Sequence, residues 1–157
     1  MDNIKEFNNV WDRVVKERNN DGSKFEGETT RLRRFMDYEA ESITAYQSLA
    51  QRSTSRRYTG VFQSIARDEQ NHLRNLQSAY FLLTGDSYRS DRRPASNQGM
   101  LAQLRSQYQK ELESAKAYEQ ASERTRIPNL AEIFKSNSKD EARHAKILEN
   151  MIRQVMR

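Results

Sequence analysis

The feature that most constrains the fold is an internal repeat, because two stretches of the chain align at an offset of 72 residues. Without a gap, residues 32–76 and 104–148 share 14 identical positions out of 45, where chance would give about three. The identical pairs are Leu32/Leu104, Arg33/Arg105, Glu39/Glu111, Glu41/Glu113, Ser42/Ser114, Ala45/Ala117, Tyr46/Tyr118, Arg52/Arg124, Phe62/Phe134, Ser64/Ser136, Asp68/Asp140, Glu69/Glu141, His72/His144 and Leu76/Leu148. The chain therefore contains two copies of one structural unit.

The pattern of each unit predicts a pair of amphipathic helices, because its apolar residues recur three and four positions apart. Ser53-Thr54-Ser55 interrupts the helical pattern of the first unit, and Ile127-Pro128 interrupts that of the second. Proline suits the first turn of a new helix. We therefore expect two helical hairpins, at residues 30–84 and 99–156, joined by a connector at residues 85–98.

The length of this connector selects among all-α folds. Its 14 residues can span roughly 46–50 Å when extended, and a helix from Tyr58 to Thr84 is about 40 Å long. The connector can thus return along the whole bundle, as the long crossover of ferritin-like four-helix bundles does. We expect such a bundle over residues 29–157. Residues 1–28 should add a short amphipathic helix and a polar loop, with the helix covering the bundle or a second subunit.

Composition excludes several classes of protein. The chain has no cysteine, which rules out disulfides, thiolate metal sites and a thiol nucleophile. No segment has the pattern of a membrane span, and the first residues lack that of a secretory signal, so we expect a cytoplasmic protein without a membrane partner. The net charge of +5 comes with acidic residues mixed among the basic ones. This mixture favours a solvated surface over a nucleic-acid site.

The two histidines of the chain occur in the same motif, Glu69-x-x-His72 and Glu141-x-x-His144. Residues three positions apart share one face of a helix, so each glutamate and histidine can bind one metal ion together. A single motif of this kind is more often a surface feature than a ligand pair. Its repetition at a fixed offset is what favours a metal site.

The first helix of each unit adds one glutamate at the same height in the bundle. Glu39 and Glu69 lie on either side of position 54, and Glu111 and Glu141 lie on either side of position 126, so each pair is centred on a predicted turn. Both pairs are then about 22 Å from the turn. Four helices thus supply the ligand set of di-iron and di-manganese carboxylate bundles to one layer. Burying these groups without a cation would cost several kcal/mol for each charge.

Four neighbouring residues have two interpretations each. Tyr46 and Tyr118 follow the layer glutamates by seven residues and are our candidate catalytic residues. Their hydroxyls either bond to ligand carboxylates and tune the site, or the rings are simply core aromatics. Asp68 and Asp140 precede the ligand glutamates and point aside by one residue. They either support the ligands or lie on the surface.

The pattern from Leu32 to Leu148 resembles the rubrerythrin branch of the ferritin-like superfamily. The resemblance implies terminal ligands at Glu39 and Glu111, bridging ligands at Glu69 and Glu141, and one iron capped by each of His72 and His144. Rubrerythrins proper also carry a cysteine-ligated rubredoxin module and a further glutamate three residues after the one corresponding to Glu111. This chain has no cysteine, and Ser114 stands at the second place.

Three functions fit these features. The first is an enzyme that holds two iron or manganese ions and reacts its reduced metal pair with hydrogen peroxide or dioxygen. It would need electrons from a separate donor protein. The second is iron oxidation for storage or delivery, although the chain shows no cage-forming surface and a homodimer is expected. The third is a metal-stabilised scaffold or sensor that binds a partner without catalysis.

Overall fold

The computed structural model describes residues 25–90 and 94–156. It contains four α-helices in these ranges and no strand: α2 (Glu26–Arg52), α3 (Arg56–Thr84), α4 (Met100–Arg124) and α5 (Pro128–Val155). The predicted all-helical fold is thus confirmed. The amphipathic helix expected near the N-terminus lies outside the described residues. None of the described helices is both long and apolar enough to span a membrane.

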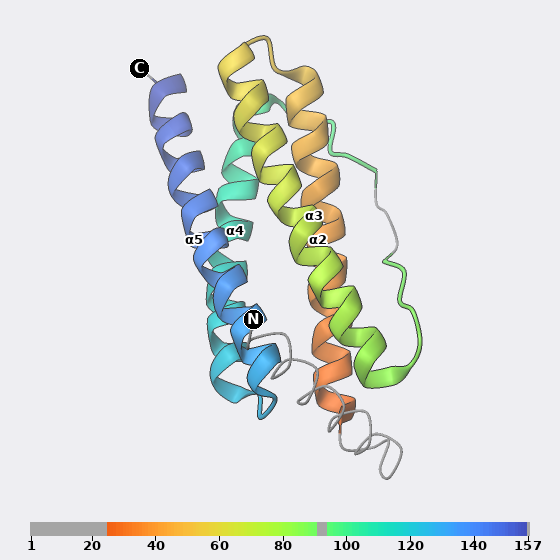
Figure 1. The fold of residues 1–157 in the computed structure, drawn as a ribbon. Helices are drawn as coiled ribbons and strands as arrows, with labels where there is room; N and C mark the ends of the chain where they lie inside the picture. The colour runs from red at the N-terminus through yellow and green to blue at the C-terminus, as the bar shows by residue number, and fades with distance from the viewer. Residues whose placement is uncertain (1–24, 91–93, 157) are drawn as a thin grey trace, which may run out of the picture.

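The helices form two antiparallel hairpins that pack side by side. α2 pairs with α3 and α4 pairs with α5, while α3 lies beside α5 and α2 lies beside α4 (Figure 1). The segment between α3 and α4 runs from the lower end of the bundle in this view to the upper end. This long crossover makes the molecule a ferritin-like four-helix bundle.

Local sequence explains where the helices begin and end. α2 begins at Glu26, so residues 26–28, which the sequence suggested as loop, are helical. The acidic Glu26 and Glu28 favour this start, because carboxylates are stabilised by the positive end of the helix dipole. The Ser55 side chain caps α3 by accepting from the Tyr58 N–H. α3 ends at Thr84 and is capped by Gly85, whose φ of 79° is readily adopted only by glycine.

The core consists of two apolar clusters separated along the bundle by a polar layer. The cluster near the start of α2 includes Phe35, Tyr118 and Phe134. The cluster at the other end includes Phe62 and Leu104. On every helix the residues between the two clusters include a predicted metal ligand, so the apolar side chains close off the polar layer from both ends.

Candidate metal centre

The structure brings the six sequence-predicted ligands together in this polar layer. All six are removed from solvent, with exposed fractions of 4% or less. They come from every helix of the bundle: Glu39 from α2, Glu69 and His72 from α3, Glu111 from α4, and Glu141 and His144 from α5. Six ionisable groups in such surroundings require compensation by opposite charge.

The ligand atoms form two overlapping groups, each compact enough for one metal ion. The groups are Glu39, Glu69, His72 and Glu141, and Glu69, Glu111, Glu141 and His144. Within each group the ligand atoms lie within 4.8 Å of one another. Glu69 and Glu141 belong to both groups. The geometry therefore gives each group its own glutamate and histidine and two glutamates in common.

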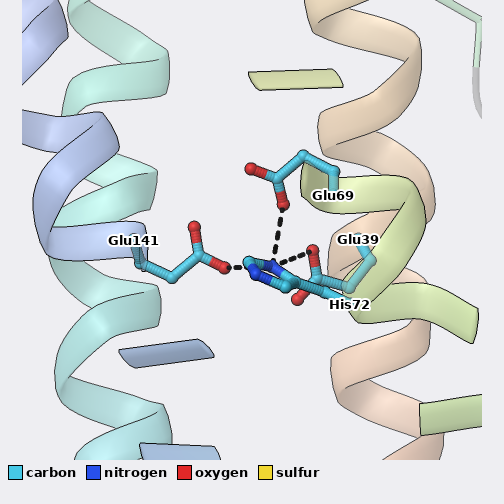
Figure 2. Close-up of side chains that lie close together, drawn as sticks. All are labelled: Glu39, Glu69, His72 and Glu141. Atoms are coloured by element: carbon cyan, nitrogen blue, oxygen red, sulfur yellow. Dashed lines mark ion pairs between the residues drawn. The ribbon is translucent and has the colours of Figure 1, made fainter. Parts of the chain in front are cut away.

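Figure 2 shows the first group, in which the His72 ring points into the layer between three carboxylates. Its Nδ1 lies 3.2 Å from Glu141 Oε1 and 3.7 Å from both Glu39 Oε2 and Glu69 Oε2. One of these carboxylates comes from the other hairpin. The first group is therefore complete only when the two hairpins are packed together.

The second group repeats this arrangement around His144. Its Nδ1 lies 3.0 Å from Glu69 Oε1, 3.2 Å from Glu141 Oε2 and 3.7 Å from Glu111 Oε2. The centroids of the two histidine rings are 6.3 Å apart. The internal repeat of the sequence thus appears in space as two equivalent half-sites.

Two ligand atoms of the layer stand out because they are buried without a hydrogen bond. His72 Nδ1 and Glu69 Oε1 are fully buried and have no hydrogen bond of good geometry, although each has an oppositely charged atom within 3.2 Å. Buried polar atoms in proteins are seldom left without such a bond. Nitrogen and oxygen ligands of this kind suit iron, manganese or zinc. The residues present therefore fit a pair of metal ions.

The pKa values of the layer show strong mutual interaction. Burial raises the pKa of Glu141 to about 8, and the negative charge of Glu39 adds to this shift. Burial alone would lower the pKa of His144, but hydrogen bonds to Glu111, Glu141 and Glu69 outweigh it and raise the value to about 12. The protein groups alone therefore hold protons that a metal ion would have to displace.

The two tyrosines connect the hairpins at the layer. The Tyr46 hydroxyl donates to Glu111 Oε1, and the Tyr118 hydroxyl donates to Glu39 Oε1. Each tyrosine thus bonds to the glutamate of the opposite hairpin rather than to the one seven residues before it. Both side chains are fully buried. The contacts match the tuning interpretation and leave a catalytic role as a prediction.

The two aspartates also reach across between the hairpins. Asp140 Oδ2 lies 3.2 Å from His72 Nε2, and Asp68 Oδ2 lies 3.1 Å from His144 Nε2. Because Nε2 donates to an aspartate, Nδ1 is the nitrogen available to a metal ion. The sequence allowed either a supporting or a surface position for these aspartates. In the structure, each aspartate lies behind the histidine ring of the other hairpin.

Arg143 was not identified from the sequence. Its Nη2 lies 2.8 Å from Asp140 Oδ1 and 3.1 Å from Asp68 Oδ2, so it joins the two aspartates. The equivalent residue in the first unit is Asn71. The surroundings of the two half-sites therefore differ at this position. Two features of the sequence could have drawn attention to Arg143: it precedes a predicted ligand histidine, and it differs from its counterpart in the repeat.

A ferritin-like bundle with a buried layer of four glutamates and two histidines defines a class of protein whose centre is suited to metal binding. The family model of rubrerythrin matches residues 103–157, which comprise α5 and all but the first turn of α4. The resemblance of the chain to rubrerythrins is thereby confirmed over its second hairpin. The curated proteins and the solved structures contain no match to the chain.

Proposed function

We propose that the protein is a di-iron carboxylate oxidoreductase that reacts its reduced metal pair with hydrogen peroxide or dioxygen. The observation that carries the proposal is the sharing of Glu69 and Glu141 between the two ligand groups. Carboxylates that belong to both groups would hold two ions next to each other. A pair of iron ions, when bound, would supply two electrons to an oxidant.

The residues of the chain would hold, shield and orient this centre. Glu39 and Glu111 each belong to one ligand group and receive a hydrogen bond from a tyrosine. These hydroxyls fix the carboxylates and are the protein protons nearest to the oxygens of both side chains. Asp68 and Asp140 orient the histidine rings. The apolar clusters above and below exclude water from the layer.

Sustained turnover would require a separate electron donor, because the chain has no cysteine for an iron–sulfur or rubredoxin-type site. Manganese is the alternative metal for the same oxygen and nitrogen ligands. Ser114, where rubrerythrins carry a further glutamate, cannot act as a ligand that moves with redox state. The proposed reaction therefore relies on the six residues of the layer.

The test is metal loading followed by rapid mixing with oxidant. Protein loaded with ferrous ion without oxygen should bind two ions per chain. Stopped-flow absorbance should then show faster oxidation by peroxide than by dioxygen, and both should exceed the rates for free ferrous ion. Oxidation no faster than in buffer would favour the scaffold function. Uptake of hundreds of irons per oligomer, measured together with size-exclusion chromatography, would favour iron storage.

A further inference from the structure

The face between α2 and α4 carries two grooves that the internal repeat relates to each other. The first, which we call the open groove, has a volume of about 390 Å³ and is lined by Arg31, Arg34, Phe35, Tyr38, Glu113 and Arg124, among others. The second, the covered groove, has a volume of about 260 Å³. Its lining includes Gln103, Ser106, Gln107, Lys110 and Glu41. At the offset of 72 residues, these five residues correspond in order to Arg31, Arg34, Phe35, Tyr38 and Glu113 of the open groove.

The covered groove shows what such a site can hold. Four residues of the crossover, Pro94, Ala95, Ser96 and Gln98, contribute to its lining, in backbone without helix or strand. Arg52 fixes this segment by donating to the carbonyl oxygens of Ser96, at 3.4 Å, and Gln98, at 2.6 Å. It also donates to the side chain of Gln103 at 2.8 Å. An arginine at the end of α2 therefore anchors a stretch of peptide without helix or strand over the groove.

The open groove has the equivalent anchor without such a segment among the described residues. Arg124 is the counterpart of Arg52 at the end of α4 and lines the groove. In residues 25–90 and 94–156, Arg124 and Arg34 form no hydrogen bond or ion pair, and Arg31 is paired with Glu28 at 2.6 Å. Within the described part of the chain, two of the three guanidinium groups therefore have no hydrogen-bond or ion-pair partner.

The open groove also differs in charge and in its floor. Arg31 and Arg34 replace the neutral Gln103 and Ser106, and Tyr38 replaces Lys110, which leaves a net gain of one positive charge. Phe35 replaces Gln107 and stacks on Tyr118 with ring centroids 4.1 Å apart, so the floor is rigid and apolar. Arginine binds carboxylates through paired hydrogen bonds. The groove thus combines an anchor for a peptide backbone with a preference for acidic side chains.

We propose that the open groove binds an acidic segment of a partner protein that has neither helix nor strand structure. Arg124 bonds to main-chain carbonyl oxygens of the segment, as Arg52 does in the covered groove. Arg34 pairs with its acidic side chains, and its apolar groups lie on Phe35. The interaction needs no metal ion, so it stands independently of the proposed oxidoreductase activity.

The experiment uses the full chain and a fluorescein-labelled peptide, acetyl-Pro-Glu-Ser-Glu-Gln-amide, which follows the length of the crossover segment. Fluorescence anisotropy should show saturable binding that weakens with added salt. Arg34→Gln and Arg124→Gln should each weaken binding by about tenfold or more. Arg57→Gln, at an exposed position at the start of α3 outside the groove, is the matched control and should bind as wild type.

Several results would overturn the proposal. One is equal binding by the wild type and both groove variants, with circular dichroism showing that the variants are folded. Another is equal binding of a probe in which glutamine replaces both glutamates. A tenfold gain in affinity after Asp12→Asn, Glu17→Gln and Asp21→Asn together would assign the groove to the N-terminal segment of the chain itself. Probe binding that is lost as the protein dimerises would assign it to a second copy.

Discussion

At the scale of single residues, the hydroxyl groups of Tyr46 and Tyr118 are the contacts that most directly test how the layer is tuned. Each is buried and donates to a glutamate of the other hairpin. Tyr46→Phe or Tyr118→Phe removes one donor and leaves the ring in place. We expect a loss of metal affinity of about 10- to 100-fold, the usual effect of removing a partner of a ligand. Isothermal titration calorimetry with Mn(II) measures it.

The control for this change is Tyr58→Phe. The Tyr58 hydroxyl bonds to Gln154 at 3.1 Å on the exposed surface, far along the helices from the ligands. Its removal should leave the affinity for Mn(II) unchanged. If the three variants bind the ion equally well, the hydroxyls of Tyr46 and Tyr118 do not support the ligands.

The protonation of Glu141 and His144 predicts how metal affinity depends on pH. With pKa values of about 8 and about 12 in the metal-free protein, both groups hold protons at neutral pH. A metal ion must displace these protons, and fewer remain to be displaced as the pH rises. The affinity for Mn(II) should therefore increase as the pH is raised from about 6 to about 8. Protons should be released on binding.

Calorimetry in buffers of different ionisation enthalpy counts these protons. Glu113→Gln alters an exposed carboxylate outside the layer and should release as many as wild type. Glu141→Gln should release fewer and bind more weakly, because it removes both a titrating group and a carboxylate common to the two ligand groups. An affinity that stays constant or falls with rising pH would contradict the assignment of protons to the layer.

At the scale of the helices, a glycine within α3 and the glycine that caps it should have opposite effects on stability when each is replaced by alanine. Gly85 has a φ of 79°, where a side chain costs roughly 1–2 kcal/mol, so Gly85→Ala should lower the free energy of unfolding. Gly60 lies within α3, and an added Cβ would meet nothing within 4 Å. Gly60→Ala should stabilise the protein by roughly 0.5–1 kcal/mol. Urea denaturation followed by circular dichroism measures both changes in the free energy of unfolding. Equal changes would contradict the conformations assigned to Gly60 and Gly85.

The positions of the ligands along their helices could be predicted from the sequence. A helix rises by a fixed amount per residue, so Glu39 and Glu69, counted from the Ser-Thr-Ser turn, must lie at one height. The same count predicts the level of Glu111 and Glu141. The hairpins and the crossover follow from helical periodicity and from the length of the connector. These are properties of one segment at a time.

The contacts between the hairpins could not be predicted in this way. Tyr46 shares a helix face with Glu39, yet it donates to Glu111, because the packing of α2 against α4 decides which carboxylate its hydroxyl reaches. Asp68 lies behind His144 for the same reason, since α3 packs beside α5. Arg143 has no identical counterpart in the repeat, so the pattern that revealed the other residues gave no weight to it.

At the scale of the whole molecule, the metal centre connects the two hairpins through residues of their polar layer. Each ligand group takes three residues from one hairpin and at least one from the other. A metal ion that binds the folded bundle must therefore stabilise the packing of the hairpins. Ion at 100 times its Kd should add about 2.7 kcal/mol to the free energy of unfolding. Thermal denaturation with and without Mn(II) measures the gain, and an unchanged Tm would contradict it.

The repeat makes a stricter prediction about His72 and His144, because each belongs to one ligand group and faces the two shared glutamates and one glutamate of its own. His72→Ala and His144→Ala should lower the number of bound ions per chain to a similar extent, and each should lose a similar part of the metal-induced rise in Tm. Metal analysis of the purified variants measures the first effect, and thermal denaturation measures the second. One difference close to the rings is Arg143, which approaches His144 Nε2 to 3.5 Å, while Asn71 takes the same position before His72. If His144→Ala is much the more damaging, Arg143→Asn, which makes the two units alike at this position, should restore equal effects of the two histidine substitutions. Unequal effects that persist in that background would show that the two half-sites are not equivalent, despite the repeat that built them.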